Sequence, residues 1–278
     1  MWTRNSPPQR RTHTRTRLCI GVVLLLLCVI MPLFSRSLPS AWNKRRPMAV
    51  SDTEGLANHD LYVPEDPRVL NPNGFDVSEV HEFDGFLSDK ECDEIIEHAR
   101  RNDVVQPSKV VCDKDNDCFN EARTSRNGFV KDDALPVAKR VSDRVSQVLG
   151  IPTSHFEDLQ VVHYRPGQQY KAHYDACVGD DPLKCDRNVK ASGQRYATFI
   201  IYLNDDFEGG ETEFPKRAGN RGQGGPLRIN PKRGKAALFF NLDDALVNVR
   251  DDSFHAGLPP TTGEKWMCNK WVRTGPLV

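Results

Sequence analysis

The chain has 278 residues, with 38 basic and 38 acidic side chains and therefore a formal net charge of zero. Its hydrophobic content of 38% is typical of a globular protein and excludes a chain that is disordered throughout. A neutral chain also lacks the basic footprint of a nucleic-acid-binding protein, so no nucleic-acid partner is expected.

An uncharged apolar segment occupies residues 18–34, after an arginine-rich head at residues 1–17. The segment is short for a membrane-spanning helix but long enough for a thin bilayer. A cleaved signal peptide and a buried core helix are the alternatives. We predict an uncleaved signal anchor, with the basic head in the cytosol and the remaining chain in the lumen. This predicts a single-pass type II protein of the endoplasmic reticulum membrane or the Golgi.

The cysteines outside the apolar segment favour the same location. Two pairs are close together within polar stretches, Cys112 with Cys118 and Cys177 with Cys185. Such short polar loops favour disulfides in an oxidising compartment. A metal knuckle is the alternative, although neither pair has the CxxC spacing of a zinc site.

Residues 35–75 are rich in Pro, Asn and Asp and have little periodicity, which predicts a stem or linker before a folded domain at residues 76–278. The domain opens with an alternating stretch, VHEFDGFLS (residues 80–88), that favours an entering strand. A helix signature follows, in which Ser88 is the predicted N-cap and Glu91 lies three residues later. A second helix is predicted over about residues 133–149, where valines recur at helical spacing and Gly150 follows.

From about residue 159 onwards the chain is typical of β-structure. Short apolar or alternating runs are separated by Gly, Pro and Asn clusters, and RYATFIIYLND (residues 195–205) is the most apolar of them. Two helices followed by many strands predict an α+β fold that is mainly β. We expect the N-terminal helices to support one side of a sandwich or jelly roll.

One group of residues has the composition of a metal site. His173 and Asp175 are two positions apart, so they share a face if they lie on a strand. His255 follows far downstream. Two imidazoles and one carboxylate leave coordination positions open and suit non-haem Fe(II). The His-x-Asp pair alone is a weak signal.

Lys265 lies ten residues after His255, at the start of a run that contains Trp266 and Trp271. A buried ammonium is costly without an anionic partner, and a dicarboxylate co-substrate would supply one. The alternative is a surface lysine whose ammonium reaches solvent from an edge strand.

These residues lie within sequence blocks that resemble the 2-oxoglutarate- and Fe(II)-dependent dioxygenases. Within that family the chain is similar to prolyl 4-hydroxylases of the plant and algal membrane-anchored type. The similarity runs from about Phe83 to Val272 and includes FLSDKECDEII, ARTSRNGF, VVHYRPGQQYKAHYD, EGGETEFP and HAGLPPTTGEKWMCNKWV. The resemblance implies a double-stranded β-helix (jelly-roll) core, with residues 76–278 as the dioxygenase domain.

The resemblance also implies roles for individual residues. The iron ligands would be His173, Asp175 and His255. The residues that bind the co-substrate 2-oxoglutarate would be Lys265, Tyr164, Thr198 and Trp271. The peptide groove would contain Tyr170 and Arg195. Ordinary strand packing is the alternative for the two tyrosines, and a surface ion pair for Arg195.

The implied reaction is hydroxylation at C4 of a peptidyl proline in secretory-pathway proteins. It would use Fe(II), 2-oxoglutarate and O₂, release succinate and CO₂, and use L-ascorbate to keep the iron reduced. Proline-rich or hydroxyproline-rich secreted polypeptides are the expected substrates. The alternatives are a dioxygenase of the same fold that acts on lysyl side chains or a small molecule, and a non-catalytic lumenal binding protein.

Overall fold

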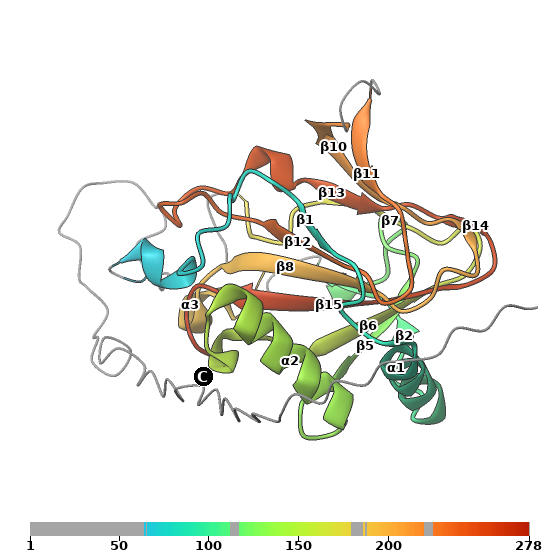
Figure 1. Ribbon diagram of the computed structural model, residues 1–278. Coiled ribbons are helices and arrows are strands. Elements are labelled where there is room, and N and C mark those ends of the chain that lie inside the picture. The colour runs from blue at the N-terminus through green and yellow to red at the C-terminus, as the bar shows by residue number, and fades with distance from the viewer. Residues whose placement is uncertain are drawn as a thin grey trace, which may run out of the picture. The chain divides into compact units, whose positions relative to one another are not determined.

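The computed structural model describes residue 64 and residues 66–111, 117–178, 186, 188–219 and 225–277. The chain divides into two units, residues 1–46 and 47–278, and every described residue belongs to the second. Within this unit, two main helices lie on one side of a large sheet and a smaller sheet lies on the other (Figure 1).

The two main helices confirm the sequence signatures. Helix α1 (Asp89–Arg101) begins at a capping box, in which the Ser88 hydroxyl accepts from the Glu91 backbone N–H and the Glu91 carboxylate accepts from that of Ser88. Helix α2 (Pro136–Leu149) begins at a proline and ends at Gly150, whose φ of 73° suits glycine. The apolar faces of both helices are buried, because valines and isoleucines recur at helical spacing.

The large sheet has seven antiparallel strands. Their spatial order is β1 (His81–Phe83), β12 (Ala236–Phe240), β8 (Arg195–Tyr202), β15 (Lys265–Arg273), β6 (Leu159–Tyr164), β5 (Arg126–Val130) and β2 (Gln106–Pro107). The small sheet has the order β11 (Pro226–Ile229), β10 (Thr212–Ala218), β13 (His255–Gly257) and β7 (Tyr170–His173).

Two short ribbons and four short helices complete the described chain. The ribbons pair β14 (Pro260–Thr262) with β9 (Glu208–Gly209), and β3 (Val110–Val111) with β4 (Asp117–Cys118). The short helices are α3 (Val189–Ser192) and the 3₁₀ turns η2 (Pro67–Leu70), η3 (Thr153–His155) and η5 (Asp251–Ser253). Leu70 of η2 is fully buried, so this part of the segment predicted as a linker packs against the domain.

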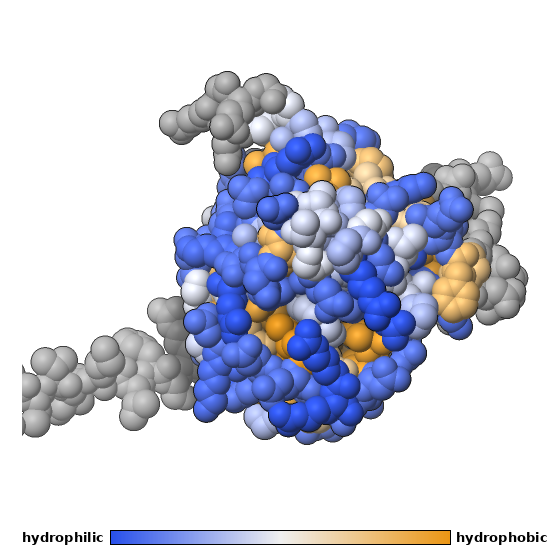
Figure 2. Space-filling model, turned by 90° about the vertical axis from the view of Figure 1, so that its right-hand side faces the viewer, coloured by the Kyte–Doolittle hydropathy of each residue, from blue (hydrophilic) through white to orange (hydrophobic). Residues whose placement is uncertain are grey.

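The hydrophobic core lies between the two sheets. Residues of the large sheet such as Ile200, Phe239 and Met267 form one cluster with Phe214 and Ile229 of the small sheet. Burial of these apolar faces is the main force that holds the sheets together. This arrangement confirms the predicted fold class, an α+β fold that is mainly β with a jelly-roll core. The face of the domain in Figure 2 is largely hydrophilic, with apolar residues in small separate patches.

The predicted membrane anchor, residues 18–34, lies outside the described residues. Within the described part of the chain, no helix combines the length and apolarity needed to cross a bilayer. The longest of these helices, α2, has 14 residues, whereas a span takes about 20. This finding contradicts the prediction of a single-pass protein of the endoplasmic reticulum or Golgi membrane, which is not retained.

The predicted disulfide loops are described only in part. Cys118 and Cys177 are each disulfide-bonded. Their predicted partners, Cys112 and Cys185, lie outside the described residues, so the two pairings stay predictions. Cys92 of α1 and Cys268 of β15 are free and buried.

Candidate active site

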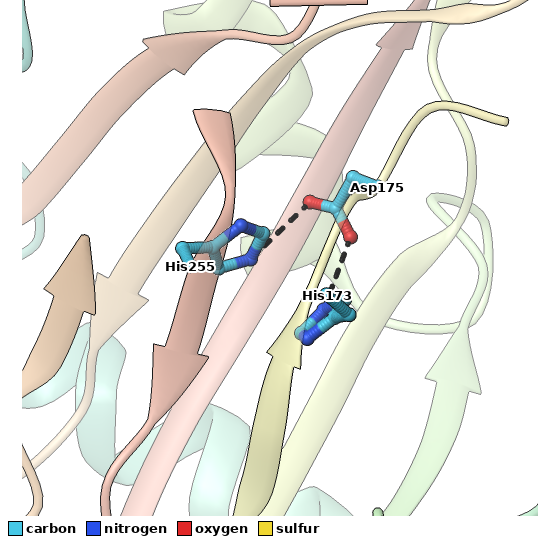
Figure 3. Close-up of side chains that lie close together, drawn as sticks. All are labelled: His173, Asp175 and His255. Carbon is cyan, nitrogen blue, oxygen red and sulfur yellow. Dashed lines mark ion pairs between the residues drawn. The ribbon is translucent and has the colours of Figure 1, made fainter. Parts of the chain in front are cut away.

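The small sheet brings the three predicted metal ligands together. His173 is the last residue of β7, and His255 is the first residue of β13, where the two are directly paired. Asp175 follows β7 by two residues and turns towards both imidazoles (Figure 3). One ligand atom from each residue lies within 4.8 Å of the other two.

The hydrogen bonds of the imidazoles fix which nitrogen faces the cluster. The Nδ1 atom of His173 lies 2.9 Å from the Lys171 carbonyl oxygen, and Nδ1 of His255 lies 2.9 Å from that of Ser253. A carbonyl oxygen only accepts, so both Nδ1 atoms carry a hydrogen and both Nε2 atoms are left to face the cluster. The Nε2 atoms lie 3.6 and 3.7 Å from the Asp175 carboxylate.

The Asp175 carboxylate is held by two donors from the large sheet. Its Oδ2 atom accepts from the Thr198 hydroxyl at 2.7 Å and from the Trp271 indole N–H at 2.9 Å. The Asn241 side-chain amide in turn donates to the Thr198 hydroxyl at 2.9 Å. Thr198 and Trp271, both predicted to line the 2-oxoglutarate pocket, therefore orient a candidate metal ligand. Of the two, only Trp271 also lines the pocket between the sheets that contains the three candidate ligands.

The electrostatics of the cluster favour the protonation states that bind a metal. Burial opposes ionisation of Asp175, but the adjacent His255 and His173 lower the pKa of its carboxyl group. Burial lowers the pKa of His255 to about 4, and the nearby His173 adds to this effect. At neutral pH the site thus presents a carboxylate and a neutral His255 imidazole.

Lys265 lies in the core between the sheets and is fully buried. Its Nζ atom donates to the Gly210 carbonyl oxygen at 2.7 Å and lies 5.0 Å above the Tyr164 ring. Burial lowers the pKa of this ammonium to about 7, which Glu211 partly offsets. Lys265 is therefore an interior cation of the kind that an anionic ligand would stabilise. Its complete burial excludes the alternative of a surface lysine.

Asn204 holds the backbone on both sides of Lys265. Its side-chain Oδ1 accepts from the Trp266 N–H at 2.7 Å, and its Nδ2 donates to the Glu264 carbonyl oxygen at 2.7 Å. β8 ends at Tyr202, so the Asn204 amide replaces the strand partner that β15 loses there. On its other side Lys265 pairs with Tyr164 of β6.

A pocket between the sheets joins these elements. It is lined by the three candidate ligands together with Tyr164, Tyr170, Ile200, Thr212, Met267 and Trp271. A wider groove of about 680 Å³ continues from it and shares its rim residues His173 and Asp175. The donor set is that of non-haem Fe(II), and the buried cation near the pocket suits a dicarboxylate.

Tyr170 and Arg195 both lie where the pocket opens into the groove. The Tyr170 ring stacks on the His173 imidazole with centroids 3.6 Å apart. The Arg195 guanidinium lies 3.6 Å from the Trp271 ring and makes two hydrogen bonds to Glu157, at 2.7 and 2.8 Å. Arg195 thus has a largely buried ion pair in place of the surface pair considered as its alternative.

Comparisons with known proteins decide the family. A model described as the 2OG-Fe(II) oxygenase superfamily matches residues 159–273. Prolyl 4-hydroxylase 2 of Arabidopsis thaliana is 35% identical over 206 residues, which are 68% of this chain and 65% of that protein. Probable prolyl 4-hydroxylase 10 of the same plant is 30% identical over 291 residues, covering 97% of this chain and 96% of that protein. The chain belongs to the prolyl 4-hydroxylase family.

Solved structures agree with this assignment. The viral collagen prolyl hydroxylase vCPH of Paramecium Bursaria Chlorella virus-1, solved as a 2OG complex, is 31% identical with a TM-score of 0.53. The match covers 70% of this chain and 95% of the viral protein. The predictions of a prolyl 4-hydroxylase family member and of a 2-oxoglutarate-dependent dioxygenase are confirmed.

The sequence patterns did not identify three residues that contact the predicted site residues. Arg123 lies 4.5 Å above the Tyr170 ring, Glu157 anchors Arg195, and Asn204 holds Lys265. Arg123 lies in the ARTSRNGF block, so that block was a usable signal. Nothing in the sequence singled out Glu157 or Asn204, because their partners are 38 and 62 positions away.

Proposed function

We propose that the chain is a prolyl 4-hydroxylase that hydroxylates C4 of a peptidyl proline. The reaction uses Fe(II), 2-oxoglutarate and O₂ and releases succinate and CO₂. One observation carries the proposal, namely that two imidazole Nε2 atoms and an oriented carboxylate converge on one pocket close to a buried lysine.

His173, Asp175 and His255 are the residues that would hold the metal. Fe(II) bound there would supply the open coordination positions for the keto acid and O₂. Because Oδ2 of Asp175 is engaged by Thr198 and Trp271, Oδ1 is the oxygen left for the metal. The donors to the carboxylate, and the carbonyl oxygens that accept from the imidazoles, thus form an outer shell that fixes the ligands before the metal binds.

Lys265 would bind the distal carboxylate of 2-oxoglutarate. Its ammonium is close to the Tyr164 ring, whose edge lines the pocket, so Tyr164 is placed to hydrogen-bond the same carboxylate. Ile200 and Met267 supply apolar walls. These walls exclude water and strengthen the ion pair, since the local dielectric constant is low.

The groove beyond the pocket would bind the peptide. Tyr170 and Arg195 lie at its entrance, next to the metal ligands. A proline-rich or hydroxyproline-rich polypeptide adopts an extended polyproline II helix that suits an open groove. L-Ascorbate is the proposed reductant that keeps the iron ferrous.

The proposal is tested with the full chain, Fe(II), 2-oxoglutarate, O₂ and a panel of proline-containing peptides. Mass spectrometry is expected to find one added oxygen on proline, matched by one succinate per product. His173→Ala should abolish both products and reduce bound iron, because it removes a ligand. His98→Ala, which changes a histidine on the surface of α1, is the matched control and should retain activity.

Each alternative has its own outcome in this experiment. Hydroxylation only of lysyl peptides or small molecules would support the dioxygenase reaction but reject peptidyl proline as the substrate. Absence of succinate under every condition would reject the enzyme and favour a binding protein. Turnover that survives His173→Ala would reject the ligand assignment.

A further inference from the structure

One aromatic side chain of the groove has no part in the proposed reaction. Phe129 of β5 is 52% exposed and lines the groove. Among the described residues, the only other exposed phenylalanine is Phe119 at 67%, which does not line this groove. An exposed phenyl ring in a groove that is continuous with a catalytic pocket suggests a contact for the substrate.

Strand register relates Phe129 to the pocket. Asn269 of β15, which lines the pocket, is paired with Gln160 of β6, and Gln160 is paired with Phe129 of β5. Residues paired across neighbouring strands share a face of the sheet. Two strand spacings separate Phe129 from Asn269, which is about 10 Å.

The neighbouring residue fixes which face of β5 is turned to the groove. A Cβ atom at Gly128 would lie 1.9 Å from the Val104 carbonyl oxygen, so no larger residue fits on that side. Because side chains alternate along a strand, Phe129 and Asn127 point to the opposite side, and both line the groove. The phenyl ring is therefore held at a defined place.

The floor between the pocket and Phe129 is polar. The Asn269 amide donates to Gln160 at 3.0 Å, and the Gln160 amide donates to Asn127 at 3.3 Å. A polyproline II helix has no internal hydrogen bonds and keeps its backbone solvated. A polar floor beside the apolar Phe129 ring is complementary to such a peptide.

We infer that Phe129 is a specificity-determining residue that contacts the substrate one polyproline II turn away from the target proline. A polyproline II helix has three residues per turn and rises about 3.1 Å per residue, so the residue three positions away lies about 9 Å along the groove. It also faces the same side as the target. Phe129 favours proline or another apolar residue there. This inference rests on the proposed hydroxylase function.

The test uses peptides with one target proline in a proline-rich host. The residue three positions before or after the target is changed from proline to glycine or glutamate, and the neighbouring positions serve as controls. Loss of one aromatic contact should lower kcat/KM about five- to tenfold at one of these two positions. Phe129→Ala should remove this preference, and Phe129→Tyr should restore it.

Phe119→Ala is the matched control and should keep the wild-type preference. Hydroxylation of every peptide with no preference at either position would overturn the inference and leave the hydroxylase function intact. A preference that persists in Phe129→Ala would likewise overturn the inference and leave the hydroxylase function intact. Failure to hydroxylate any peptide would instead overturn the proposed function on which the inference rests.

Discussion

The candidate metal site and the proposed peptide groove are built in different ways. Each candidate ligand makes a hydrogen bond to the surrounding protein, and those from Thr198 and Trp271 to Asp175 come from the buried large sheet. The groove is open, and the exposed Phe129 lines it. The chemistry thus depends on a rigid interior, whereas substrate choice depends on side chains that can change with little effect on stability.

Among the substitutions in the interior site, Lys265→Ala should have the largest effect on co-substrate binding. Loss of a buried charged partner should raise the KM for 2-oxoglutarate about 100-fold or more and leave iron content near normal. Steady-state kinetics and iron analysis measure the two effects separately. Lys270→Met is the matched control, since Lys270 is also a buried lysine of β15 but pairs with Asp132. An unchanged KM in Lys265→Ala, or a loss of its iron, would contradict the assignment.

Trp271→Phe separates the hydrogen bond to Asp175 from ring packing. The variant keeps an aromatic ring for Arg195 and removes the indole donor, so iron affinity should fall about 10- to 100-fold. Metal titration of both proteins measures this effect. Trp266→Phe is the control, because the buried Trp266 indole N–H has no hydrogen-bond partner among the described residues. Equal iron affinities in the two variants would mean that the Asp175 contact is dispensable.

The pH dependence of co-substrate binding tests the charge of Lys265. Burial lowers its pKa to about 7, so the free enzyme loses this positive charge as pH rises above that value. The KM for 2-oxoglutarate should therefore rise with pH above 7, by up to about tenfold per unit. Lys265→Arg keeps its charge and should flatten the profile. A wild-type KM that stays constant from pH 6.5 to 9 would contradict this prediction.

Asn204→Ala should have the smallest effect of the four. It removes the hydrogen bonds to the peptide groups on both sides of Lys265, and the KM for 2-oxoglutarate should rise about five- to tenfold. Peptide KM and iron content should not change, which distinguishes positioning from a general loss of structure. Asn248→Ala alters a surface loop and is the control. Parallel increases in both KM values would point to a merely structural role.

Local sequence patterns predicted much of this fold, because their causes are local. The capping box at Ser88 and Glu91, the helix end at Gly150, and the strand of His173 need only neighbouring residues. Strand order could not be predicted in this way. β15 lies between β8 and β6, from which it is separated by many residues, and only the folded sheet shows this pairing.

In the candidate site, too, local patterns could be predicted and contacts between distant positions could not. Residue type and spacing identified His173, Asp175, His255 and Lys265. The contacts that orient them, such as Thr198 with Asp175, join positions that are distant in the sequence. The prediction that Thr198 contacts the co-substrate therefore could not include its hydrogen bond to Asp175, a candidate metal ligand.

A crystal structure of the full chain with Mn(II) and 2-oxoglutarate, without O₂, would test the central claim most directly. We expect the metal about 2.0–2.3 Å from Nε2 of His173, Nε2 of His255 and Oδ1 of Asp175. The distal carboxylate of the keto acid should lie within hydrogen-bonding distance of the Lys265 ammonium. A metal bound elsewhere, or a keto acid that leaves Lys265 without an anionic partner, would contradict the account.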